Sequence, residues 1–148
     1  MYDRSASLLQ TVGTQLLMPS IVCSAFCLEL YFKALIVIEK GGVAPRGHDL
    51  QFLFSCVSKT NQMKIRAFFN QRTRVNAARI AQFAAAEKAA GIASKPWTFD
   101  NVLAASKRAF EKLRYAYQKD LQSGEGWMAN DIKDGTRAII LALHPDWA

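Results

Sequence analysis

The sequence predicts an all-α fold, a bundle of helices joined by short antiparallel connections. Apolar residues recur at helical spacing in most segments, and the alternation of apolar and polar residues that marks strands is nearly absent. The eight glycines and four prolines lie mostly where such segments end. A chain of 148 residues is long enough to bury one core, so we expect a single domain over residues 1–148.

The first half of the chain predicts three helical segments. An amphipathic stretch over residues 8–17 ends or kinks at Pro19, and a second helix follows directly. Gly41-Gly42 closes that second helix. After a loop, Asp49 is suited to begin a short helix, because its side chain can accept hydrogen bonds from the first free backbone N–H groups.

The second half predicts three further segments. The polar, alanine-rich stretch from Lys59 to about Ala90 reads as one helix of roughly thirty residues, a length that suggests a kink. Residues 91–96 break the chain, and Thr98 caps a strongly periodic helix. The last helix runs from about Asn130 to Leu143 and ends at His144-Pro145.

Glu29 and Lys33 place a carboxylate and an ammonium one helical turn apart inside an apolar helix. Buried charges are tolerated only when they are paired and hydrogen-bonded. The two residues are therefore either a rim pair or part of an internal polar cluster. His48 either bonds across the bundle to Glu29, presents its imidazole to a ligand, or joins Asp49 in organising the loop before the short helix.

Two residues of the later periodic helix are candidates for the same cluster. Arg114 and Tyr115 follow its apolar face, so we expect one of them to point inward toward Glu29 and Lys33. An arginine paired with a carboxylate through two hydrogen bonds would fix the register of the two helices.

Several classes of protein are disfavoured. The apolar run over residues 21–38 has the length of a membrane span, but Glu29 and Lys33 near its centre would be costly in a bilayer. The N-terminus lacks the pattern of a secretory signal, so we expect a cytoplasmic protein with no membrane association. The three cysteines sit in apolar surroundings without a metal-ligand pattern. We expect reduced thiols, no metal and no cofactor.

A basic stretch is the main candidate for binding. The net charge is +7, and no acidic residue occurs between Leu50 and Ala86. Basic side chains at helical spacing can follow the phosphates of RNA, although a solvated helix face is the alternative. The candidate phosphate-binding residues are Lys64, Arg66, Arg72, Arg74 and Arg79.

Four motifs in this order and spacing resemble a bacterial HEPN-type helical domain. They are Glu29-x-x-x-Lys33-x-Leu35, Gly47-His48-Asp49-Leu50 with Leu53-Phe54, Phe110-Glu111-Lys112-Leu113-Arg114-Tyr115-x-Tyr117, and His144-Pro145-x-Trp147. The resemblance implies an up-and-down bundle of four to five helices, commonly a homodimer. Its superfamily contains RNases of toxin–antitoxin and defence systems, partners of nucleotidyltransferases, and non-catalytic RNA-binding or scaffold members.

The active RNases of that superfamily carry an arginine followed, after about four to six residues, by a histidine. Arg137 and His144 fit this spacing. In that chemistry the arginine stabilises negative charge on the phosphate, and the imidazole takes a proton from the 2′-hydroxyl. The alternative is a cation near the end of the last helix and a capping histidine, both favoured by the helix dipole.

The function expected from these observations is a HEPN-like domain that binds RNA or a partner protein in a bacterial toxin–antitoxin, defence or stress context. An antitoxin or a nucleotidyltransferase is the partner that the resemblance suggests. The alternatives are a metal-independent endoribonuclease that uses Arg137 and His144, and a non-catalytic structural or regulatory dimer module.

Overall fold

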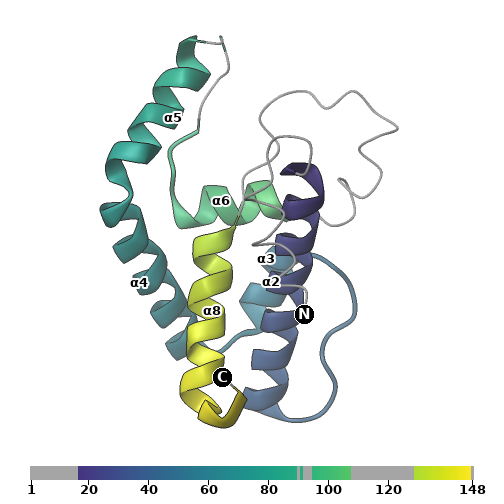
Figure 1. Ribbon diagram of the computed structural model, residues 1–148. Helices are drawn as coiled ribbons and strands as arrows, with labels where there is room; N and C mark the ends of the chain where they lie inside the picture. The colour runs from purple at the N-terminus through teal and green to yellow at the C-terminus, as the bar shows by residue number, and fades with distance from the viewer. Residues whose placement is uncertain (1–16, 90, 92–94, 108–128, 148) are drawn as a thin grey trace.

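The computed structural model of the protein describes residues 17–89, 91, 95–107 and 129–147. These residues form six α-helices and one short 3-10 helix without any strand, which confirms the predicted all-α class (Figure 1). None of the described helices is long and apolar enough to cross a membrane. The elements are α2 Leu17–Lys40, α3 Leu50–Cys56, α4 Lys59–Val75, α5 Ala77–Ala89, α6 Phe99–Ser106, α8 Asn130–Leu143 and η3 Pro145–Trp147.

Most of the predicted helix ends are confirmed. Gly41 follows the last residue of α2 with a φ of +71°, a left-handed conformation that favours glycine. The side chains of Asp49 and Thr98 cap α3 and α6 by accepting backbone N–H groups. The start of α2 differs, because Pro19 lies within its first turn rather than before it. Proline is tolerated there, since the first N–H groups of a helix have no acceptor within the helix.

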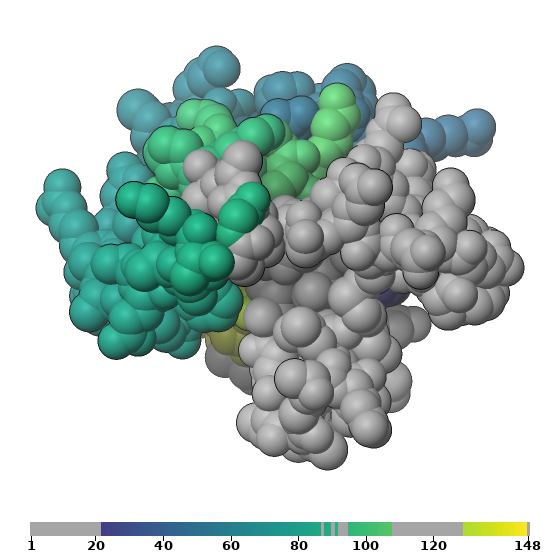
Figure 2. Space-filling view, turned by 90° about the horizontal axis from the view of Figure 1, so that it is seen from above, coloured from purple at the N-terminus to yellow at the C-terminus, as the bar shows by residue number. Residues whose placement is uncertain are grey.

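The predicted kink in the long basic segment is confirmed at Asn76, which separates α4 from α5 with a φ of −95° and a ψ of 12°. Beyond this residue α5 projects past the other described helices (Figure 1). Seen from above, its side chains form one edge of the molecule (Figure 2). The stretch that looks like one helix in the sequence is therefore a packed helix followed by a projecting one.

α4 packs antiparallel to α8. Phe68 lies against Gly135, and one turn further along α4 the guanidinium of Arg72 approaches Asp131, near the start of α8. α2 lies beside α8 and runs in the same direction, while α6 crosses near one end of the bundle (Figure 1). The predicted helical segments over residues 8–16 and 108–121 lie outside the described residues.

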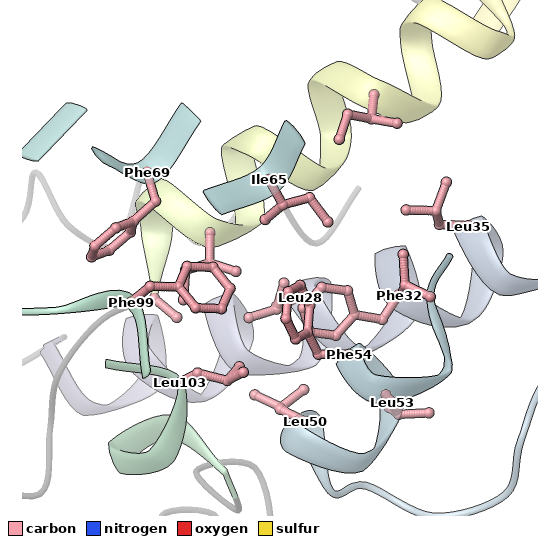
Figure 3. Packing of buried hydrophobic residues seen from close by; sticks show 14 of the residues in the cluster. Leu28, Phe32, Leu35, Leu50, Leu53, Phe54, Ile65, Phe69, Phe99 and Leu103 are labelled. Carbon is pink, nitrogen blue, oxygen red and sulfur yellow. The ribbon is translucent and has the colours of Figure 1, made fainter. Parts of the chain in front are cut away.

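The core is built from aliphatic and aromatic side chains of every described α-helix except α5 (Figure 3). Phe54 of α3 lies between Phe32 and Phe99, with ring centroids 5.6 Å and 4.9 Å away. Phe69 of α4 meets Phe99 edge to face at 5.5 Å. Aromatic pairs in this range of distances and tilts add stabilisation beyond that of apolar burial.

Two polar side chains fasten the ends of α2, α3 and α4. The Glu39 carboxylate of α2 accepts hydrogen bonds from the Ser58 backbone N–H and hydroxyl, both at 2.7 Å, and from the Asn61 amide at 2.6 Å. A carboxylate beside the N-terminus of α4 is stabilised by the positive end of that helix dipole. The Gln62 amide donates to the carbonyl oxygens of Phe54, Ser55 and Val57 at the end of α3.

Gly135 allows α8 to approach α4 closely, and this contact yields a stability prediction. A Cβ at this position would lie 3.0–3.2 Å from three carbons of Phe68. Alanine in a helix interior normally gains about 1 kcal/mol over glycine, whereas overpacking costs about 1–3 kcal/mol. We expect Gly135→Ala to lower the free energy of unfolding by about 1 kcal/mol in denaturant melts. A rise of about 1 kcal/mol in the free energy of unfolding, which is the ordinary effect of replacing glycine by alanine in a helix, would contradict the close contact.

Candidate functional site

Glu29 is the centre of a polar cluster. It lies in the middle of α2 and is only 2% exposed. The Lys33 ammonium donates to one of its carboxylate oxygens at 2.7 Å, and His48 Nδ1 lies 2.8 Å from the other. The partners reach toward solvent, because the Lys33 side chain is 21% exposed and that of His48 is 41% exposed. The structure thus joins three of the six residues predicted for the polar cluster, with the carboxylate buried and both partners partly exposed.

The imidazole of His48 is oriented by this contact. When Nδ1 carries the proton it donates to the Glu29 carboxylate, and the neutral ring then has its acceptor at Nε2. The loop before His48 turns at Gly47, whose φ of +101° is left-handed. The buried carboxylate therefore fixes where the chain between α2 and α3 returns to the bundle.

Asp49 has a structural role beside the cluster. Its Oδ1 accepts the backbone N–H groups of Gln51 and Phe52 at 3.0 and 3.1 Å, and its Oδ2 lies 3.1 Å from the Lys107 ammonium. Burial alone would raise the pKa of Asp49. The Phe52 amide and Lys107, helped by the Gln51 amide, outweigh burial and hold the pKa below the ordinary value of 3.8.

The remaining two residues predicted for the cluster, Arg114 and Tyr115, lie outside the described residues. A second buried charge was not anticipated from the sequence. Lys133 of α8 is only 4% exposed, and its ammonium lies 3.6 Å from the Asp134 carboxylate. A lysine in an amphipathic helix gives no sequence signal that separates burial from exposure.

Two of the five predicted phosphate-binding residues are engaged in the fold. The Arg66 guanidinium donates to both carboxylate oxygens of Asp100, at 3.0 and 2.7 Å, and lies 4.3 Å from the Phe99 ring centroid. Its hydrogen bonds lower the pKa of Asp100 despite partial burial. Arg72 Nε lies 3.6 Å from Asp131 Oδ1, a looser pair.

The other three, Lys64, Arg74 and Arg79, are exposed and make no ion pair with any described residue. Lys64 and Arg74 lie on the side of α4 away from its buried residues Ile65 and Phe69. Arg79 follows on α5, past the kink. We call these three exposed residues, which lie on two consecutive helices, the basic face.

Arg137 and His144 occupy the outer part of α8. Arg137 is exposed, and His144 is half-buried at the C-cap, where its backbone N–H donates to the Ile140 carbonyl at 2.8 Å. Seven positions put both residues on one side of the helix, about 10 Å apart along its axis. The His144 ring stacks on Trp147 of η3, with centroids 4.3 Å apart and a tilt of 14°. The structure gives His144 a defined ring orientation but no side-chain contact with Arg137.

The described residues hold no group of three or more histidine, cysteine, aspartate or glutamate side chains that fits a metal ion. The three cysteines are free thiols, with Cys27 buried and Cys23 and Cys56 half-buried. Comparison of the chain with models of known protein families, with curated proteins and with solved structures finds no match.

The lowered pKa of Asp49 predicts an acid-dependent loss of stability. A carboxyl whose pKa is depressed on folding stabilises the fold above its unfolded pKa, here about 3.8, and loses that effect as the pH falls through the folded pKa. Asp49→Ala should cost about 1 kcal/mol near neutral pH, as the loss of an N-cap does. The difference in free energy of unfolding between Asp49→Ala and wild type, measured in denaturant melts, should become smaller as the pH falls below about 4. A stability difference that stays constant down to pH 2 would contradict the account in which the ionised Asp49 side chain stabilises the start of α3.

Proposed function

We propose that the protein binds RNA through the basic face, as a HEPN-like domain in a bacterial toxin–antitoxin, defence or stress context. The observation that carries the proposal is the separation of its cations into two groups. Arg66 and Arg72 are paired with acids of other helices, whereas Lys64, Arg74 and Arg79 point to solvent without such partners among the described residues. Exposed cations without acidic partners attract a polyanion.

The dimensions of the basic face suit a nucleic-acid strand. Lys64 and Arg74 are ten positions apart on α4, which corresponds to about 15 Å along the helix axis. Arg79 follows five positions after Arg74, on α5. No acidic residue lies in the sequence between these positions, so nothing on the face itself repels phosphates. The contacts would be to the backbone of the RNA and would position it without reading its sequence.

The biological setting rests on the motifs that resemble HEPN-type domains. The all-helical fold supports that setting, and so does the cluster that joins Glu29 and Lys33 to the His48 of the glycine-histidine-aspartate motif. The same proposal includes that the protein forms a homodimer, that its partner is an antitoxin or a nucleotidyltransferase, and that it is located in the cytoplasm. A protein partner with an acidic surface is the competing ligand for the basic face.

Salt-dependent RNA binding tests the proposal. Affinity for an unstructured RNA oligonucleotide should fall steeply between about 50 and 200 mM salt, because each phosphate contact releases counterions. Arg74→Glu/Arg79→Glu should weaken binding and flatten the plot of log affinity against log salt by about 1 to 2 units. Fluorescence anisotropy titrations measure both quantities.

The matched control is Lys40→Glu/Arg46→Glu, which changes the net charge equally at two exposed residues near the end of α2. It should leave the salt slope nearly unchanged. Equal effects of the two double variants would show that binding depends on the net charge of the protein and not on the basic face. If wild type fails to bind at the lowest salt, the RNA proposal is wrong and an interaction with a protein becomes the better account.

Cleavage of the bound RNA is a second candidate function, favoured by the exposure of Arg137 on the same side of α8 as the oriented His144 ring. His144 would take the proton of a 2′-hydroxyl, and the 2′-oxygen would attack phosphorus while the bond to the 5′-oxygen breaks. The arginine would stabilise the charge on the phosphate. The departing 5′-oxygen would take a proton from solvent water, and the products would be a 2′,3′-cyclic phosphate and a 5′-hydroxyl, formed without a metal ion.

This candidate predicts cutting of single-stranded RNA in the presence of a chelator, measured on denaturing gels. Arg137→Ala and His144→Ala should each abolish cutting and leave RNA binding in place. His48→Ala, at the only other histidine of the chain, is the control and should still cut. Cutting by His144→Ala at the wild-type rate would remove this candidate.

A further inference from the structure

The projecting helix α5 carries an aromatic side chain that the core does not use. Phe83 is 64% exposed, and its ring has no partner among the described aromatic and guanidinium contacts. The two phenylalanines of α4 are engaged elsewhere, because Phe69 is buried in the core and Phe68 packs on Gly135. Of the three phenylalanines in α4 and α5, Phe83 is thus the one whose ring is exposed to solvent.

Phe83 lies beside a cation of the basic face. Arg79 precedes it by four positions, so the two side chains share one side of α5 with Cβ atoms about 6 Å apart. Ala84, Ala85 and Ala86 follow Phe83 and are exposed, and their methyl groups are too short to cover its ring. The helix therefore presents an exposed apolar ring and an exposed guanidinium next to each other.

We propose that Phe83 and Arg79 form a site for single-stranded RNA, in which an unpaired base stacks on the Phe83 ring and Arg79 contacts the adjoining phosphate. This inference rests on the proposed RNA-binding function and specifies its ligand. Aromatic rings stack on any base whose face is open, while a cation holds the backbone. In a duplex the base faces are covered by neighbouring base pairs, so the ring finds no partner there. Arg79, in contrast, can contact a phosphate of either form.

A second copy of the chain is a less suitable occupant of this site. Residues 59–89, which form α4 and α5, carry seven Lys and Arg side chains and a single acidic residue, Glu87, so two such segments repel each other. Like charges across such a contact oppose association. A polyanion relieves the same repulsion. The charge of the face therefore favours RNA over self-association through Phe83.

The test compares the affinities of one RNA sequence in single-stranded and duplex form, measured by anisotropy at low salt. Loss of one stacked base corresponds to a reduction in affinity of about 5- to 150-fold. Phe83→Ala should show a loss in this range for the single strand and less than about a twofold loss for the duplex. Phe83→Trp, which keeps a stacking ring, should retain wild-type affinity. Alanine favours a helix, so the first variant should fold normally, as circular dichroism can verify.

Met63 supplies the matched control. It lies on α4 with the same exposed fraction, 64%, and Met63→Ala should leave both affinities unchanged. Equal losses on single strand and duplex in Phe83→Ala, or no loss on either, would overturn the stacking site while leaving phosphate binding by the basic face intact. Failure of the wild-type protein to bind either RNA would overturn the proposed function itself. A shift from dimer to monomer in Phe83→Ala with unchanged RNA affinity would assign the ring to contact between copies.

Discussion

A buried carboxylate that must be paired is the constraint around which this helical bundle is arranged. Glu29 lies in the middle of the largely apolar α2, and its carboxylate pairs with Lys33 through one oxygen and with His48 through the other. The second of these contacts ties α2 to the loop that leads into α3. Because Asp49 follows directly and caps α3, the same short segment determines where that helix begins. Phe54 of α3 then completes the aromatic core with rings from α2 and α6.

The charged residues of the protein divide by what they contact. Glu39, Arg66 and Asp49 each satisfy groups of another element and thereby position helices. The cations of the basic face point away from the core. A charge committed to a partner inside the fold has lost much of its capacity to attract a ligand, whereas an unpaired exposed charge contributes little to stability. Stability and binding therefore depend on different members of one basic segment, so substitutions can separate the two.

Local features of the sequence predict the helix ends well, because caps such as Gly41, Asp49 and Thr98 act through backbone geometry within a few residues. The pairing of Glu29 with His48 was among the alternatives, since a buried charge demands a partner. The sequence does not reveal which cations remain exposed, because the partner of Arg66 lies 34 positions away. The sequence likewise does not reveal that Phe83 is exposed, because this depends on α5 projecting past the other described helices beyond Asn76. Glu39 was overlooked, although an acid in the last turn of a helix opposes the dipole and so signals a partner elsewhere.

The most direct measurement of the central claim is the free energy of unfolding of Lys33→Ala/His48→Ala, with and without Glu29→Gln. Removing both partners leaves the Glu29 carboxylate buried and unpaired, which should cost about 3 kcal/mol or more. Neutralising that carboxylate with Glu29→Gln should then recover at least about 1 kcal/mol, since the buried charge is gone. Two results would contradict an account in which the buried carboxylate organises the bundle. One is a loss below about 1 kcal/mol in the double variant, which is the range of exposed pairs. The other is a further loss of stability when Glu29→Gln is added.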